Sequence, residues 1–273
     1  MKEHDIERLH ARNNQVHLSF SNIMLVFVLF FLFIPLIVVV TYSFNETKEM
    51  NFTGFTLQWY KKLFTDSSAL WAAFTNSLLV AMLSSITATI LGSMAAIGIK
   101  WYQFKARKAI ISVSYLPMVL PEVIVGVSML IFFSSLNINL GLFTIYIAHT
   151  TFNLPFVFLL VSARLDEFDY STIEAARDLG ATETQSLFKV VIPSILPGIL
   201  SGLLMSVTMS LEDFVITFFV TGAGSDTLPL YVYSQIRYGV SPVINALSMI
   251  VILGTMALAW VCKSFLKTIA ANS

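Results

Sequence analysis

Apolar stretches long enough to cross a lipid bilayer alternate along the chain with shorter polar segments. A bilayer core about 30 Å thick needs roughly 20 helical residues to cross it. A membrane-spanning β-barrel would instead show a period of two in hydrophobicity. The pattern therefore predicts an all-α polytopic membrane protein with six transmembrane helices, at residues 22–42, 72–99, 109–133, 140–162, 196–220 and 244–265.

The first apolar stretch is longer than the apolar region of a signal peptide. The residues from Tyr42 to Asn45 that follow it contain no small-residue cleavage site. We therefore interpret residues 22–42 as a retained helix that follows an amino-terminal arm, residues 1–21. The main transmembrane domain is expected over residues 70–266 and includes a long polar loop, residues 163–195.

Composition supports a bilayer location, because 56% of the residues are hydrophobic and only 12% are charged. A soluble domain carries about 25% charged residues. The formal net charge is zero, so the positive excess that nucleic-acid binding requires is absent. The single cysteine, Cys262, can form neither an intramolecular disulfide nor a cysteine cluster, and no metal site is expected.

Most of the 16 Lys and Arg residues lie in the terminal segments and in the loops after the second and fourth spans. Basic residues gather on the cytoplasmic side of membrane proteins. This distribution and the even number of spans predict that both termini are cytoplasmic. The long loop between the fourth and fifth spans is then cytoplasmic as well.

The residues of this loop predict a helical hairpin. Ser171 and Glu174 have the spacing of a capping box, and Gly180 can end the helix in a left-handed conformation. Thr182 and Gln185 form a second capping box. The helix that follows is expected to stop at the membrane, at Pro193 and Pro197.

The first helix of the hairpin has the character of a docking surface. Ala175 and Ala176 would let another surface approach its backbone, while Glu174, Arg177 and Asp178 would set the register of the contact. An alternative is that Glu174 only caps the helix and the alanines only raise helix propensity.

No phosphate-binding loop of the form Gly-x-x-x-x-Gly-Lys-Ser/Thr occurs in the sequence, so the chain is expected to be no ATPase and to bind no cofactor. Energy for any transport would come from a partner or from an ion gradient. Gly222 and Gly224 lack the context of a nucleotide-binding motif and are interpreted as a flexible turn.

Three acidic residues fall within the predicted spans, namely Glu122, Glu212 and Asp213. A charge at the centre of a span costs about 2.5–3.5 kcal/mol, so such residues are candidates for function. Pro117 and Pro121 interrupt the helix just before Glu122, which favours a position beside a translocation path. An organic polycation would suit this negative field, although the acids could instead be protonated or bonded within the protein.

Aromatic and imidazole side chains in the spans and at the external end of a possible path have two interpretations each. Tyr231, Tyr233 and Tyr238 could add cation–π contacts to a cationic solute, or could be ordinary aromatic residues of the membrane interface. His149 is interpreted as a hydrogen-bonded packing residue rather than a ligand.

The loop resembles the signature loop of the membrane subunits of ATP-binding-cassette importers. The resemblance rests on Glu174-Ala175-Ala176, Gly180, Val190, Ile192 and Pro193, with Val190 and Ile192 where the family prefers Ile and Leu. In that family the loop forms a coupling helix that sits in a groove of the ATPase subunit. The resemblance implies this role for Glu174, Ala175, Ala176, Arg177, Asp178 and Gly180.

From Tyr60 to about Leu258 the chain resembles the permease subunits of spermidine/putrescine importers. Ser210-Leu211-Glu212-Asp213-Phe214 is one of the matching segments, with Glu212 where the family expects the first of two aspartates. The resemblance implies a bacterial inner-membrane assembly of a second related permease, two ATPase subunits and an external polyamine-binding protein, with ATP and Mg²⁺ bound at the ATPases. Its substrate pathway would contain Glu122, Glu212, Asp213, Tyr231 and Tyr233.

Two alternatives to polyamine import stay open at this stage. A related permease could carry another solute, such as iron or a small anion. An ion-driven secondary carrier could use Glu122 and Asp213 as proton sites, but such carriers usually contain an internal repeat, and none is apparent in the sequence.

Overall fold

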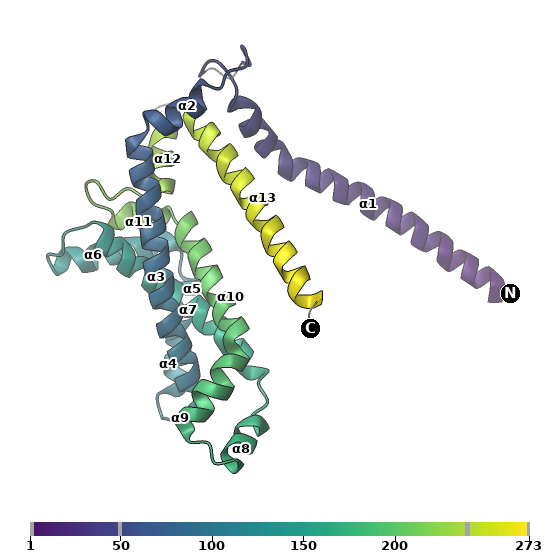
Figure 1. Cartoon of the computed structure of the whole chain (residues 1–273), viewed down its shortest axis with the longest axis vertical. Helices are drawn as coiled ribbons and strands as arrows, with labels where there is room; N and C mark the ends of the chain where they lie inside the picture. Colours follow the sequence, from purple (N-terminus) through teal and green to yellow (C-terminus); the bar gives the residue numbers. More distant parts are fainter. Residues whose placement is uncertain (1–2, 49–50, 238–240, 272–273) are drawn as a thin grey trace. The chain divides into compact units, whose positions relative to one another are not determined.

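The computed structural model describes residues 3–48, 51–237 and 241–271, with side chains described for residues 20–48, 51–237 and 241–257 (Figure 1). Over these residues the chain is helical and has no strands, apart from one isolated bridge between Asn45 and Phe55. It divides into two compact units, Met1–Ser67 with Gln235–Ser273, and Ser68–Ser234. The elements are α1 (Glu3–Tyr42), α2 (Gln58–Thr65), α3 (Ser68–Trp101), α4 (Arg107–Ser114), α5 (Leu116–Val119), α6 (Glu122–Ser135), α7 (Leu142–Asp166), α8 (Ser171–Asp178), α9 (Glu183–Ser186), η1 (Leu187–Val191), α10 (Ile192–Glu212), α11 (Val215–Val220), α12 (Leu228–Arg237) and α13 (Pro242–Ala271).

In the first unit, α13 packs against α1 and α2, and the side chain of Leu63 on α2 is fully buried. The loop after α1 is ordered around Asn45. Its side-chain amide donates to the carbonyl oxygens of Thr47 and Asn51, and its Oδ1 accepts the Thr53 backbone N–H at 2.8 Å. The apolar part of α1 exposes almost all of its side chains within this chain, which suits a helix that faces lipid or another subunit.

The second unit is built around α3, α7 and α10, which pack against one another. Small residues allow this close approach. A Cβ added to Gly92 on α3 would lie 3.0 Å from the Val157 side chain on α7, and one added to Gly202 on α10 would lie 3.1 Å from it. Glycine is enriched at membrane helix interfaces because it lets backbones approach. Val157 is fully buried between the two glycines.

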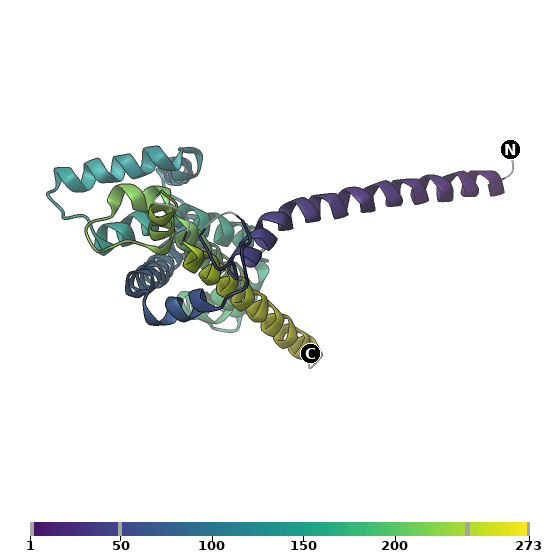
Figure 2. The same cartoon turned by 90° about the horizontal axis from the view of Figure 1, so that it is seen from above.

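The third predicted span, residues 109–133, is not a single helix, and the interruption predicted before Glu122 is confirmed. The chain there forms α4 and α5, turns by 107° and continues as α6. Leu120 is extended, with φ −75° and ψ 137°, the conformation that a residue before proline favours, and Pro121 begins the next segment. Figures 1 and 2 show α6 lying crosswise to α3.

The fifth predicted span, residues 196–220, is also wrong as one continuous helix. Here α10 begins earlier, at Ile192, and ends at Glu212, while α11 begins at Val215. Asp213 between them is extended, with ψ 121°. Its carboxylate accepts the backbone N–H groups of Ile216 and Thr217, which diverts them from the helical ladder and starts a new helix.

By length and composition, four helical segments of the described chain could cross a membrane, and the bent pair of α4–α5 with α6 would make five. Over its described side chains α13 is a shorter apolar helix, Pro242–Ala257. The count of six therefore stays a prediction. The four segments are Phe20–Tyr42, Ser68–Trp101, Leu142–Asp166 and Glu183–Glu212.

Candidate functional site

The hairpin formed by α8, α9 and η1 contains the residues of the importer signature. Its first helix does not begin with the predicted capping box, because neither Ser171 nor Glu174 makes a side-chain cap. Asp169 supplies the acceptor instead, and its Oδ1 lies 2.9 Å from the Ser171 backbone N–H. Hydrogen bonds from the backbone and the hydroxyl of Ser171 hold the pKa of the Asp169 carboxyl below its usual value.

The end of α8 agrees with the sequence. Gly180 has φ +85°, which only glycine adopts without strain. Its N–H donates to Arg177 O at 2.8 Å, and the Ala181 N–H donates to Ala176 O at 3.0 Å. These two bonds are those of a Schellman motif, so the predicted left-handed helix terminus is confirmed.

The second arm of the hairpin starts as predicted and ends differently. Thr182 and Gln185 form both bonds of a capping box, at 3.2 and 2.9 Å. Pro193 and Pro197 do not stop this arm, because η1 leads directly into α10. The π-helical turn at residues 187–191 lies just before Pro193, and the Ile192 N–H donates to Leu187 O five residues back. This wider turn lets the helix continue through a proline that has no N–H to donate.

Buried and exposed side chains divide α8 into an anchoring face and an outer face. Ile173 is buried in the core that contains Leu165 and Ile195. The signature residues Glu174 and Ala175 are exposed, as are Arg177, Asp178 and Gly180, whereas Ala176 is half-buried. Leu179, at the tip, is 90% exposed. An apolar side chain so exposed at the end of a helix is suited to burial by a partner.

The guanidinium of Arg177 on α8 is directed toward α9, the second arm of the hairpin. Its Nη2 lies 3.3 Å from Glu183 Oε1 on α9. The Trp101 indole N–H at the end of α3 approaches the same oxygen at 3.5 Å. Lys100, also on α3, pairs with Asp166 at the end of α7. Polar contacts therefore hold the hairpin to the end of α3.

At the second candidate site, the fold brings the three acids together. Glu122 begins α6, Glu212 ends α10 and Asp213 follows it. The Glu122 carboxylate lies within electrostatic range of both others. Glu122 and Glu212 are exposed within this chain, whereas the Asp213 side chain is only 8% exposed. Close packing of α6 on α11 supports this arrangement, since a Cβ added to Gly126 would lie 2.7 Å from the Phe219 ring.

Asp213 belongs to a buried polar network that connects four helices. Its Oδ2 accepts the Thr217 backbone N–H at 2.9 Å and the Thr217 hydroxyl at 2.8 Å. His149 on α7 places Nε2 3.1 Å from the same oxygen and Nδ1 2.7 Å from Ser210 Oγ. Ser84 Oγ on α3 lies 3.3 Å from the Ser210 hydroxyl.

The interpretation of His149 as a hydrogen-bonded packing residue is confirmed, since it is 2% exposed and fully bonded. Sequence reasoning missed Ser84, Ser210 and Thr217 as members of this network. Thr217 carried no clear local signal, because a capping aspartate accepts from N–H groups two or three residues later, and Thr217 follows Asp213 by four.

The predicted tyrosines lie on α12. The rings of Tyr233 and Phe214 have centroids 4.5 Å apart, which places Tyr233 beside the residue that follows Asp213. Tyr231 is half-buried. Tyr238 lies outside the described residues.

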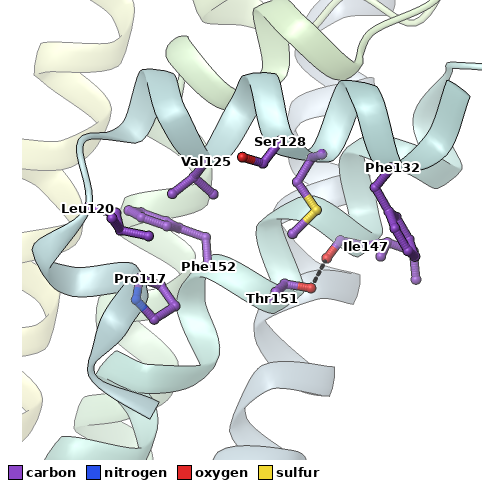
Figure 3. A pocket seen from close by; sticks show the side chains of 9 residues that line it. Pro117, Leu120, Val125, Ser128, Phe132, Ile147, Thr151 and Phe152 are labelled. Carbon is purple, nitrogen blue, oxygen red and sulfur yellow. Dashed lines mark hydrogen bonds between the residues drawn. The ribbon is translucent and has the colours of Figure 1, made fainter. Parts of the chain in front are cut away.

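The bend between α5 and α6 encloses an apolar cavity of about 550 Å³ against α7 (Figure 3). Pro117 and Leu120 line it from the α5 side, and Phe152 lines it from α7. Figure 3 shows the Thr151 hydroxyl turned to the Ile147 carbonyl oxygen, a bond of 2.8 Å, so this hydroxyl is already satisfied. Over the described residues, no group of three or more His, Cys, Asp or Glu side chains could hold a metal ion.

This helical fold and its signature hairpin define a class of membrane transport subunit. The chain belongs to the family of binding-protein-dependent transport system inner membrane components, whose family model matches residues 88–265. It is thus a permease subunit of an ATP-binding-cassette importer, and the predicted family is confirmed.

Among its relatives is the spermidine/putrescine transport system permease protein PotC of Haemophilus influenzae, 37% identical over 84% of this chain and 89% of that protein. The putrescine transport system permease protein PotI of Escherichia coli K12 is 38% identical over 81% of this chain and 82% of that protein.

Solved structures share the fold. A bacterial ABC transporter that imports the acidic polysaccharide alginate contains a chain with a TM-score of 0.73, at 18% identity, covering 93% of this chain and 98% of that chain. A chain of the MetNI methionine ABC transporter gives a TM-score of 0.58 at 21% identity, over 70% of this chain and 91% of that chain.

Proposed function

We propose that this permease subunit forms half of the translocation pathway of a polyamine importer, with spermidine or putrescine as the solute. The observation that carries the proposal is the gathering of Glu122, Glu212 and Asp213 around the break between α10 and α11. The described helices α6, α10 and α11 contain no Lys or Arg that could neutralise them. A polyamine carries several ammonium groups, which carboxylates bind well in a site of low dielectric constant.

The names of the relatives support a polyamine and the acids argue against an anion. PotC and PotI are named for spermidine/putrescine and putrescine transport. The alginate transporter shares the fold and takes an acidic polysaccharide, so the fold alone leaves the solute open. A cluster of carboxylates would repel such a solute, whereas it would attract a polycation. Tyr231 and Tyr233 would add cation–π contacts in this proposal.

In the proposed assembly a second related permease completes the pathway, two ATPase subunits hydrolyse ATP with Mg²⁺, and an external binding protein delivers the solute. Six spans in the bacterial inner membrane, with both termini cytoplasmic, would place the hairpin beside the ATPases. The exposed face of α8, with Glu174, Ala175, Ala176, Arg177, Asp178 and Gly180, would dock there, with Leu179 as an apolar contact. Closure of the ATPases would then open the cavity between the two permease subunits to the outside. ATP hydrolysis would return this cavity to its inward-facing state.

The test is the ATPase activity of the complex reconstituted from this chain, its partner permease, the ATPase and the binding protein. We expect spermidine or putrescine to stimulate ATP hydrolysis, and molybdate and ferric iron to leave it at the basal rate. Stimulation by molybdate or iron alone would refute the polyamine assignment and return the acids to structural roles. Solute uptake driven by a proton gradient without ATP would indicate a secondary carrier.

A further inference from the structure

One imidazole joins the two sides of the break between α10 and α11. Nδ1 of His149 lies 2.7 Å from Ser210 Oγ, two residues before α10 ends. Nε2 lies 2.9 Å from Thr217 Oγ1 on α11 and 3.1 Å from Asp213 Oδ2 in the break itself. His149 comes from the first half of α7, which packs against α3 and α10. The break is therefore held from outside by a residue of a third helix.

The partners of the ring define its proton positions. An ionised Asp213 carboxylate only accepts hydrogen bonds, and the Thr217 hydroxyl donates to that carboxylate at 2.8 Å. Both neighbours of Nε2 therefore accept, so this nitrogen carries a proton. Nδ1 faces a hydroxyl that can donate or accept, and the Ser84 hydroxyl 3.3 Å further on can reverse with it. The network is thus complete with the imidazole neutral or charged.

The two carboxylate oxygens of Asp213 differ in the number of hydrogen bonds that they accept. Oδ2 is surrounded by the Thr217 N–H, the Thr217 hydroxyl and the His149 ring. In the part of the chain that is described, Oδ1 accepts a single hydrogen bond, the 3.3 Å contact from the Ile216 N–H. A carboxylate oxygen can accept two hydrogen bonds or more, so Oδ1 keeps an acceptor position while Oδ2 has none to spare.

We propose that His149 is a positioning residue for polyamine transport, which turns Asp213 so that Oδ2 is bonded inside the protein and Oδ1 is left to accept from a substrate ammonium group. The inference rests on the proposed function, because it gives the orientation of a carboxylate that the proposed function places on the pathway. Because three groups hold one of its oxygens, the carboxylate is already oriented before the ammonium group binds. Binding then does not include the entropy cost of ordering this side chain.

Two amide substitutions of His149 test the hydrogen bonds of the two ring nitrogens separately. The amide nitrogen of glutamine reaches the position of Nε2, so His149→Gln keeps the donor toward Asp213 and Thr217 and loses the contact with Ser210. Asparagine is one methylene shorter and reaches the position of Nδ1, so His149→Asn keeps the Ser210 contact and loses the other. The two variants are matched in polarity and differ in which side of the break they hold.

The experiment measures spermidine uptake into proteoliposomes that contain the full complex, normalised to the amount of assembled complex. The variants are His149→Asn, His149→Gln, Asp213→Asn and the double variant with His149→Asn and Asp213→Asn. We expect His149→Asn to lower uptake about tenfold, because Asp213 Oδ2 then loses one of the three groups that orient the carboxylate. His149→Gln should retain more than about half of the uptake, since the contact with Asp213 survives.

The double variant decides whether His149 acts through Asp213. If it does, the double variant transports no worse than Asp213→Asn alone, because residues of one network are not additive. A merely structural His149 would give losses that multiply, and this result would overturn the inference while leaving Asp213 on the pathway. Normal uptake by Asp213→Asn would overturn both the pathway role and the positioning role.

Poor folding of one variant does not remove the test. If His149→Asn fails to assemble, His149→Gln still decides, because an assembled His149→Gln complex that loses about tenfold in uptake contradicts a role through the Asp213 side of the ring. Retained uptake in that complex, with loss in Asp213→Asn, supports it.

Discussion

Replacement of Gly180 by alanine tests the link between the shape of the hairpin and transport. Gly180 has φ +85°, and a Cβ at this position would meet no atom within 4 Å. The cost of Gly180→Ala is therefore conformational and not steric, about 1–2 kcal/mol for an L-residue in the left-handed region. That energy corresponds to a factor of about 5–30 in the population of the correct turn.

A matched control exists in the same chain. Gly224 has φ +75°, and a Cβ there also meets nothing within 4 Å, but it lies in the turn between α11 and α12 and not in the hairpin. Gly224→Ala should therefore carry a similar conformational cost with no effect on coupling. Gly180→Asn should be milder than Gly180→Ala, because asparagine tolerates the left-handed region.

The assay compares solute uptake with ATP hydrolysis in proteoliposomes containing the full complex, for Gly180→Ala, Gly180→Asn and Gly224→Ala. We expect Gly180→Ala to reduce the number of solute molecules transported per ATP several-fold, and Gly224→Ala to leave this ratio at the wild-type value. Equal ratios for the two alanine variants would refute the reasoning, since the same strain would then have the same effect in either turn.

Two further predictions follow from the hairpin and from the turn after α11. Glu174→Arg should leave membrane insertion intact and uncouple ATP hydrolysis from uptake, because Glu174 is exposed on the face of α8 proposed to dock and makes no cap within the helix. Glu174→Gln is the milder control. Normal uptake by Glu174→Arg would show that this residue has no part in coupling. Gly222→Ala should lower the thermal stability of the detergent-solubilised subunit, because the added Cβ would overlap the Leu140 carbonyl group, and overpacking costs about 1–3 kcal/mol or more. Gly98→Ala is the control, because the Cβ added there has nothing within 4 Å. Equal melting temperatures for the two variants would contradict the packing argument.

Several features of the fold could be predicted because they depend on residues close together in the sequence. The Thr182–Gln185 capping box and the Gly180 terminus each need only a few neighbouring residues, and both are observed. The importer signature is also local, and it led to the correct family. The capping box predicted at Ser171 failed for a local reason too, because the Asp169 carboxylate two residues earlier binds the Ser171 N–H.

Helix breaks were harder to place, because a hydropathy pattern reports how apolar a segment is and not whether its backbone stays helical. The stretch around Pro121 is apolar throughout, and the prolines indicated an interruption but not a turn of 107°. At Asp213 no proline marks the break, which depends on a carboxylate taking the N–H groups of Ile216 and Thr217. A hydropathy pattern averages over such residues, so it predicted one helix where the chain forms two.

Membrane insertion, the helical class and the presence of candidate acids follow from the chemistry of single residues, since the cost of exposing an apolar group to water or a charge to lipid depends little on the fold. Which of those acids lie together depends on long-range packing. Close contact of Gly92 and Gly202 with Val157 brings α3, α7 and α10 together, and His149 on α7 thereby reaches Ser210 and Asp213. No local pattern contains that distance, because it is set by side chains that fill the space between helices far apart in the sequence.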